Sequence, residues 1–127
     1  MVLVVDDDPS LRVVLRLLLE REGHMVVEAP HGKAALIAIQ QKGVPDVVTT
    51  DLRMPVLGGE ELIRHLRSDP ATAAIPIVVI SGNQDAALAL HARRLVEAVL
   101  LKPFDVANVA RCIKDVAGNA ALHQATG

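Results

Sequence analysis

The chain has 127 residues, a net charge of −2 and a composition that is 51% hydrophobic and 22% charged, with Phe104 as its only aromatic residue. This predicts one folded domain with an aliphatic core and excludes wholesale disorder. No basic run points to nucleic acid or an anionic membrane as a partner, and a single cysteine excludes an intrachain disulfide framework. Without a signal-like or membrane-spanning segment, we expect a cytoplasmic location.

Five short aliphatic runs predict strands in chain order. They are rich in Val and Ile and mostly unbroken by polar residues, which is typical of strands that are covered on both faces of a sheet. The runs occupy residues 2–5, 25–29, 46–50, 75–80 and 98–101.

Helical patterns follow each predicted strand. The first helix is expected to begin at Asp8-Pro9, because Asp is a strong N-cap and Pro suits the first helical position, and to end at Gly23. Its predicted inward residues are spaced at i, i+3, i+4 and i+7: Leu11, Val14, Leu15 and Leu18. Further helices are expected over 32–42, 60–67, 85–94 and from 105 to Gly118.

Alternating strands and helices predict the α/β class, with a parallel sheet covered by helices on both faces. The predicted domain covers residues 1–118, and residues 119–127 are expected to be a C-terminal tail or the start of a linker. In such folds, ligands bind at the carboxyl ends of the strands.

Chemically reactive side chains are predicted at that edge. Asp6 and Asp7 follow the first strand, Asp51 follows the third, Ser81 follows the fourth and Lys102 follows the fifth. Clustered carboxylates favour a hard cation with oxygen ligands, Mg²⁺ above all. A lysine and a hydroxyl beside them suit a phosphoryl group, and a carboxylate can itself be the nucleophile that forms an aspartyl phosphate.

Four motifs carry a family resemblance. In order, they are VLVVDDDPSLR (2–12), VVTTDLRMPVLGG (47–59), IPIVVISGN (75–83) and LLKPFD (100–105). With these motifs, essentially the whole chain resembles the receiver domains of bacterial two-component response regulators. The resemblance implies a (βα)5 fold with a five-stranded parallel sheet in the order 2-1-3-4-5, flanked by five helices.

The resemblance also implies roles for individual residues. Asp51 is the expected phosphoacceptor, while Ser81 and Lys102 are expected to contact phosphoryl oxygens. Mg²⁺ is the expected cofactor, held by Asp6, Asp7, Asp51 and the main-chain carbonyl of Arg53. A cis peptide is expected between Lys102 and Pro103. Asp8 is expected to cap the first helix and to point away from the metal.

Several positions depart from the family pattern. Val99 stands where the family usually has an aromatic residue or His, so the usual inward turn of a ring cannot occur. Leu95-Val96 replaces a frequent Gly-Ala pair, so the turn before the last strand must differ or carry strain. Gly82 replaces Ala and opens space beside the site. Arg53 and Asn83 are expected to tune the lifetime of the phosphorylated state.

The resemblance implies a phosphoacceptor receiver, a switch that catalyses its own phosphorylation and dephosphorylation rather than an enzyme acting on an external substrate. Its expected partners are a sensor histidine kinase or a histidine phosphotransfer protein, and a downstream effector bound by protein–protein contact, with the chain a monomer or weak dimer. Two alternatives stay open: a phosphorelay shuttle, free or from a hybrid histidine kinase, and an interaction module that no longer depends on phosphorylation.

Overall fold

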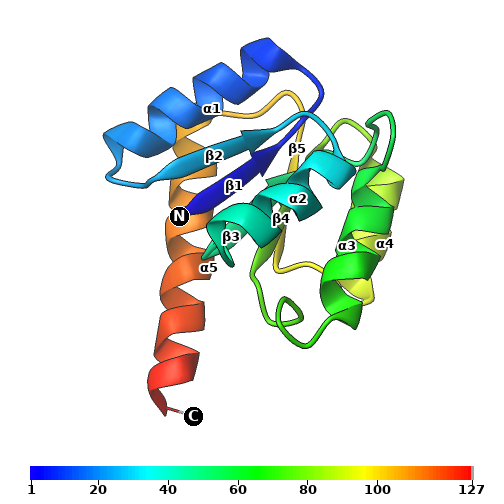
Figure 1. Cartoon of the computed structure of the whole chain (residues 1–127). Coiled ribbons are helices and arrows are strands. Elements are labelled where there is room, and N and C mark those ends of the chain that lie inside the picture. Colours follow the sequence, from blue (N-terminus) through cyan, green and yellow to red (C-terminus); the bar gives the residue numbers. More distant parts are fainter. Residues whose placement is uncertain (127) are drawn as a thin grey trace.

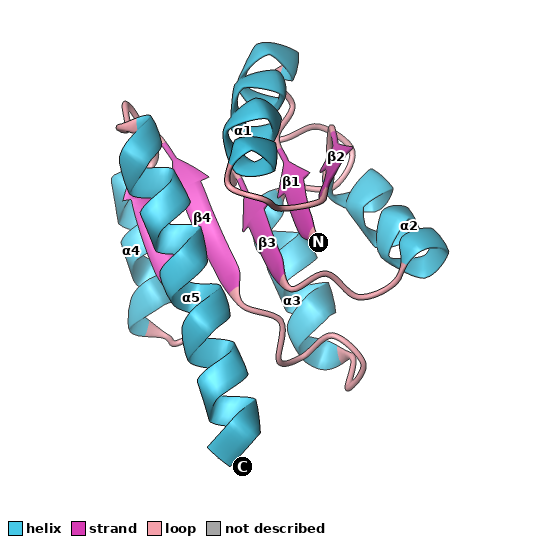
Figure 2. Ribbon diagram, turned by 90° about the vertical axis from the view of Figure 1, so that its left-hand side faces the viewer, coloured by secondary structure: helices cyan, strands magenta, loops and turns pink. Residues whose placement is uncertain are grey.

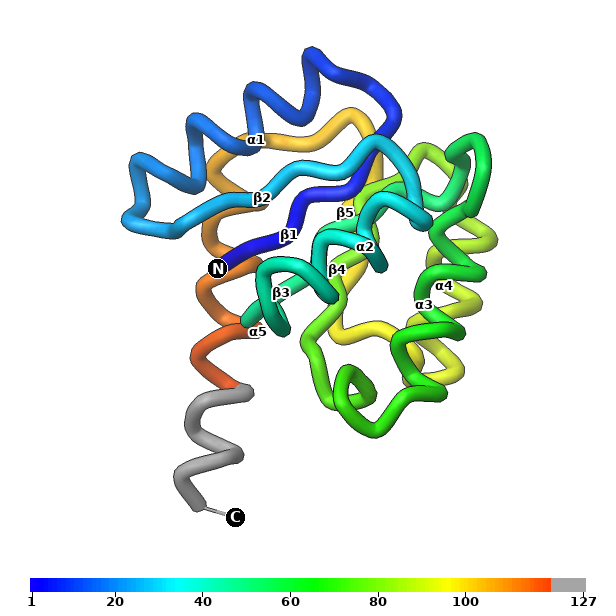
Figure 3. Tube along the Cα trace, viewed as in Figure 1, coloured from blue at the N-terminus to red at the C-terminus, as the bar shows by residue number. Residues whose placement is uncertain are grey.

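A computed structural model describes the backbone of residues 1–126 and the side chains of residues 1–119. Five strands form one parallel sheet in the order β2-β1-β3-β4-β5. Their bounds are β1 (Val2–Val5), β2 (Val26–Ala29), β3 (Val47–Thr50), β4 (Ile77–Ser81) and β5 (Ala98–Leu101). The first strand of the chain, blue in the trace, therefore lies inside the sheet between β2 and β3 (Figure 3).

Helices cover both faces of the sheet, as Figures 1 and 2 show. Their bounds are α1 (Pro9–Arg21), α2 (Gly32–Lys42), α3 (Gly59–Ser68), α4 (Gln84–Ala92) and α5 (Val106–Thr126). Residues of α1 and α5 share one core cluster with one face of the sheet, and residues of α2, α3 and α4 share the other. The predicted fold class, strand order and five helices are confirmed.

Strand residues alternate between these two clusters. In β1, Val2 and Val4 belong to the cluster with α1 and α5, whereas Leu3 and Val5 belong to the other. All four are buried. An uninterrupted aliphatic strand is therefore required here, because successive side chains point to opposite faces and both faces are dry.

The first helix begins as predicted. Asp8 caps α1 by accepting hydrogen bonds from the backbone N–H groups of Ser10 and Leu11, and Pro9 is its first residue. The prediction that Val14 faces inward is wrong, because its side chain is 48% exposed while Leu15 and Leu19 are fully buried. The buried stripe of α1 is narrower than its run of aliphatic residues.

Helices α1 and α4 end in the same hydrogen-bonded turn. After α1, the N–H groups of Gly23 and His24 donate to the carbonyls of Glu20 and Leu19, and Gly23 has a positive φ of 93°. This pattern is the Schellman motif, which needs one left-handed residue after the helix.

In α4 the left-handed residue is Arg94, with φ 58°, one position before Leu95. The N–H groups of Arg94 and Leu95 donate to the carbonyls of His91 and Leu90. The turn therefore does not require Leu95 to adopt a positive φ; the conformational cost falls on Arg94 instead.

The last helix is longer than predicted. Gly118 was expected to end it, but α5 continues to Thr126. Glycine lowers helix stability by only about 1 kcal/mol, so a single glycine does not by itself end a helix. Within the described part of the chain, no helix is both long and apolar enough to span a lipid bilayer.

Candidate functional site

The sheet itself aligns the backbone of the site. The N–H of Asp6 donates to the last residue of β2 over 3.1 Å, and the N–H of Asp51 donates to the last residue of β1 over 3.1 Å. The N–H of Lys102 donates to the carbonyl of Ser81 over 2.9 Å. Asp6, Asp51 and Lys102 are thus each held one residue beyond a strand by a further ladder hydrogen bond, and Ser81 is the last residue of β4, so all four lie at the carboxyl edge of the strands. The predicted convergence on this edge is confirmed.

Lys102 joins two of the aspartates. Its ammonium Nζ lies 2.7 Å from Oδ2 of Asp51 and 3.3 Å from Oδ2 of Asp6. Partial burial acts to lower the pKa of Lys102, but the hydrogen bond to Asp51 and the charges of both aspartates outweigh it and raise the pKa above its ordinary value. Lys102 is therefore a permanent positive charge at the site.

Asp51 is fixed at both carboxylate oxygens. Oδ1 accepts the backbone N–H of Leu52 over 2.6 Å, and Oδ2 accepts from Lys102. Its carbonyl oxygen accepts the hydroxyl of the buried Thr50 over 2.7 Å. The side chain is 12% exposed, so it is restrained but reachable from solvent.

Asp6 is the buried member of the acidic group. Its Oδ1 accepts the N–H of Asp8 over 2.9 Å. Burial raises the pKa of Asp6, aided by the negative charge of Asp51, while the Asp8 N–H and the charge of Lys102 act in the opposite direction. The carboxyl group is therefore in a site where added positive charge is favourable.

Asp6, Asp7 and Asp51 each present one carboxylate oxygen, and these three oxygens all lie within 4.8 Å of one another. One of the three residues is buried, one is partly buried and one is exposed. Three carboxylate oxygens at such distances match the ligand preference of Mg²⁺, which takes a few carboxylates and keeps several waters. The donor set therefore fits the cation that the sequence predicts.

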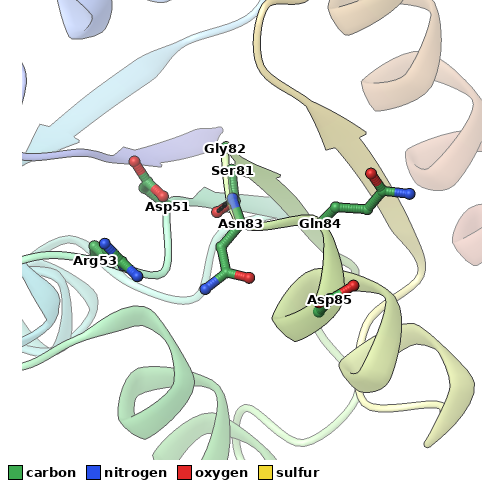
Figure 4. A pocket seen from close by; sticks show the side chains of 7 residues that line it. All are labelled: Asp51, Arg53, Ser81, Gly82, Asn83, Gln84 and Asp85. Carbon is green, nitrogen blue, oxygen red and sulfur yellow. Dashed lines mark hydrogen bonds between the residues drawn. The ribbon is translucent and has the colours of Figure 1, made fainter.

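Ser81 forms the opposite wall. Its hydroxyl oxygen accepts the N–H of Asn83 over 3.0 Å, which leaves the hydroxyl hydrogen free to turn toward an acceptor in the site. A pocket of about 540 Å³ lies beside it, with Asp51 and Arg53 on one side and residues 81–85 at the start of α4 on the other (Figure 4). Gly82 has open space where a β-carbon would be, as the sequence predicted.

Gly59 is a site residue that was not predicted from the sequence. A β-carbon on Gly59 would lie 2.0 Å from the carbonyl oxygen of Asp51, and its N–H donates to the carbonyl of Leu52 over 3.0 Å. Any side chain here would push the backbone of Asp51 aside. The Gly58-Gly59 pair was the only available signal, and a pair of glycines does not say which backbone comes close.

Two further predictions concern the neighbourhood of Lys102. The Lys102–Pro103 peptide is cis, as expected. Val99 is half-buried and packs against the core cluster that includes α2, α3 and α4. A short aliphatic side chain at this position has neither a ring to turn nor a polar tip to offer.

Comparison with known proteins agrees with this geometry. The family described as response regulator receiver domain matches residues 2–114. Protein PilH of Pseudomonas aeruginosa is 33% identical over 116 residues, which are 91% of this chain and 95% of PilH. The crystal structure of a response regulator receiver protein from Pseudomonas putida is 34% identical, with a TM-score of 0.81 over 90% of this chain and 94% of that one.

Some similar proteins are much longer. Sensor histidine kinase TmoS of Ectopseudomonas mendocina is 39% identical over 81% of this chain, which spans 10% of the kinase. The chain likewise spans 10% of the gliding motility regulatory protein of Myxococcus xanthus. Receiver domains thus occur both as nearly whole proteins and as parts of larger ones. The sheet order, the acidic edge and these matches together show that the chain belongs to the response regulator receiver domains of two-component signalling.

Proposed function

We propose that this chain takes a phosphoryl group from a phosphohistidine donor onto Asp51 and signals through protein–protein contacts that depend on it. The observation that supports this most is the contact of Lys102 with Asp51, 2.7 Å long, at the edge where three carboxylates meet. In the transfer, a carboxylate oxygen of Asp51 attacks phosphorus and an acyl phosphate forms. The P–N bond to the donor imidazole breaks, and the imidazole leaves with the electron pair and takes up a proton.

The neighbouring residues have distinct tasks. Lys102 is already charged and can follow one phosphoryl oxygen as it arrives, because its stem is flexible and its ammonium has three donors. The Ser81 hydroxyl can donate to another phosphoryl oxygen. Both donors stabilise negative charge that increases around phosphorus during transfer.

Mg²⁺ would be held by the carboxylates of Asp6, Asp7 and Asp51 and by the main-chain carbonyl of Arg53. When bound, the metal supplies positive charge that offsets the repulsion among the carboxylates and the incoming phosphoryl group. Without it, Lys102 is the cation found within contact distance of Asp6 and Asp51 among the described residues. One ammonium cannot neutralise three carboxylates and a phosphoryl group.

The donor is expected to be a histidine kinase or a histidine phosphotransfer protein. Val99 favours the shuttle form of this function, because a chain that only passes the phosphoryl group onward needs no aromatic switch. A direct test mixes the phosphorylated chain with a histidine phosphotransfer protein and follows the phosphoryl group. Transfer onto histidine supports the shuttle, and retention on this chain supports a terminal receiver.

Intact mass spectrometry tests the proposed function. The chain is incubated with phosphoramidate in Mg²⁺ or in EDTA, and the Asp51→Asn variant is treated in parallel. One Mg²⁺-dependent phosphoryl adduct that is lost in Asp51→Asn is expected. No adduct in a folded protein that binds Mg²⁺ would favour the phosphorylation-independent interaction module instead.

A further inference from the structure

Arg12 lies outside the set of residues proposed to hold Mg²⁺ or the phosphoryl group, yet it contacts the backbone of that set. It lies in the second turn of α1, and its side chain is only 17% exposed. Its Nη1 donates to the main-chain carbonyl of Asp6 over 2.6 Å, and its Nε donates to Oε1 of Glu28 on β2 over 3.3 Å. One planar guanidinium therefore joins the loop that carries the aspartates to the neighbouring strand.

This contact fixes the direction in which the chain leaves Asp6. The Asp6 carbonyl belongs to the same planar peptide unit as the nitrogen and Cα of Asp7. The Asp6 N–H is held by β2, and its carboxylate is held by Asp8 and Lys102. With its carbonyl held by Arg12 as well, Asp6 has little freedom, and the peptide plane that leads to Asp7 is set.

The position of the Asp7 carboxylate depends on the orientation of this peptide plane, because within the described part of the chain hydrogen bonds hold the carboxylates of Asp6 and Asp51 but not that of Asp7. Its side chain is exposed, and among the residues whose side chains are described no hydrogen bond to its carboxylate is found. Even so, one of its oxygens lies within 4.8 Å of oxygens of Asp6 and Asp51. Repulsion between the carboxylates acts to separate them, so the backbone must supply the restraint.

Glu28 restrains the side chain of Arg12. It accepts from Arg12, and its Oε2 also lies 3.1 Å from Nε of Arg16. Glu28 holds the Arg12 guanidinium in place beside the Asp6 carbonyl, so the main contribution of Arg12 is the position of its Nη1 donor. Lysine could not replace it, since a single ammonium lacks the fork that reaches the carbonyl and the carboxylate together.

We propose that Arg12, held by Glu28, is a positioning residue that orients the Asp6–Asp7 peptide and so presents the Asp7 carboxylate to Mg²⁺. This rests on the proposed function insofar as the three aspartates bind that cation. Residues outside the ligand shell that orient ligands in this way typically change metal affinity about 10–100-fold when they are replaced.

Isothermal titration of the whole chain with Mg²⁺ tests the proposal. Arg12→Gln and Arg12→Lys are each expected to weaken Mg²⁺ binding about tenfold, and Glu28→Gln is expected to weaken it by a smaller factor. Arg16→Gln is the matched control, because Arg16 contacts Glu28 but has no contact with the Asp6 carbonyl. It is expected to leave Mg²⁺ affinity within about twofold of wild type.

Phosphorylation rates supply a second readout. In the Arg12 variants the Mg²⁺ concentration for half-maximal rate should rise, while the rate at saturating Mg²⁺ stays near that of wild type. A merely structural role would instead lower the melting temperature in EDTA and leave the Mg²⁺ affinity of the folded molecules unchanged. That result, in either Arg12 variant that folds and in Glu28→Gln, would overturn the proposal. A wild-type chain that binds no Mg²⁺ would overturn the metal site itself, together with this inference.

Discussion

Gly59 lies directly against the backbone of Asp51, so close that a β-carbon on Gly59 would be 2.0 Å from the Asp51 carbonyl oxygen. Gly59→Ala is therefore expected to displace Asp51, to lower the free energy of unfolding by about 1–3 kcal/mol and to slow phosphorylation. Urea denaturation and the rate of adduct formation measure the two effects.

Gly82→Ala is the matched control for this change. Gly82 also lines the site, but nothing lies within 4 Å of its β-carbon position. The free energy of unfolding of Gly82→Ala should differ from that of wild type by no more than about 0.5 kcal/mol. If the two alanine variants behave alike, the close approach at Gly59 is not the cause.

Asp6→Asn separates folding from metal binding. Burial raises the pKa of Asp6, so ionising this carboxyl costs the folded protein free energy that the unfolded chain is spared. The metal-free protein thus loses stability as pH rises from the ordinary carboxyl pKa up to the raised pKa of Asp6, and the loss is complete above that value.

In EDTA near neutral pH, Asp6→Asn should therefore raise the free energy of unfolding and flatten its acid-side pH dependence. Its Mg²⁺ affinity should fall by about tenfold or more, because a ligand is lost. Denaturation at several pH values and titration calorimetry check these outcomes. A variant that is less stable than wild type in EDTA would show that the Asp6 carboxylate is well satisfied without metal.

The Schellman motif that ends both α1 and α4 predicts stability changes of opposite sign for two substitutions at its left-handed residue. Arg94 adopts the left-handed conformation that Gly23 adopts after α1. This conformation costs a non-glycine residue roughly 1–2 kcal/mol. Arg94→Gly should therefore stabilise the protein by up to about 1 kcal/mol, after the extra entropy that glycine loses on folding. Gly23→Arg should destabilise it by about 1–2 kcal/mol. Thermal melts of the two variants measure these changes. If both variants are stabilised or both are destabilised, the left-handed conformation is not the cause.

Arg53 lines the pocket beside Asp51, where its guanidinium can cover a phosphoryl group and hinder the approach of water. Arg53→Ala is expected to speed the loss of phosphoryl about fivefold, which corresponds to ~1 kcal/mol in the barrier. Arg64→Ala, which removes an exposed arginine of α3 that contacts Glu60, is the control. An unchanged lifetime in Arg53→Ala would exclude this shielding role.

The sheet and the acidic edge were predictable because they follow from short patterns. Strands buried on both faces need unbroken aliphatic runs, and residues directly after such runs, such as Asp6 and Asp51, must share an edge of the sheet. The cap at Asp8 was likewise predictable from two adjacent residues, because Asp is a preferred N-cap and Pro is a preferred first residue of a helix.

Features that depend on tertiary contacts were not predictable. Val14 fits a helical apolar spacing, yet only the position of the sheet decides that Leu19 is buried in its place. The contacts of Gly59 with Asp51 and of Arg12 with Asp6 are both made to a backbone carbonyl, and the residue types alone do not say which carbonyl comes close. The left-handed Arg94 follows no residue preference and was found only in the backbone.

Reductive trapping identifies the phosphorylated residue, which is proposed to be Asp51. The chain is treated with phosphoramidate and Mg²⁺, reduced with borohydride, which converts an acyl phosphate of aspartate to homoserine, and mapped by peptide mass spectrometry. Phosphohistidine is not converted in this way, so the five histidines do not confuse the result. Homoserine is expected at position 51 alone. Homoserine at position 6 or 7, or at no position while the intact chain carries phosphate, would contradict this proposal.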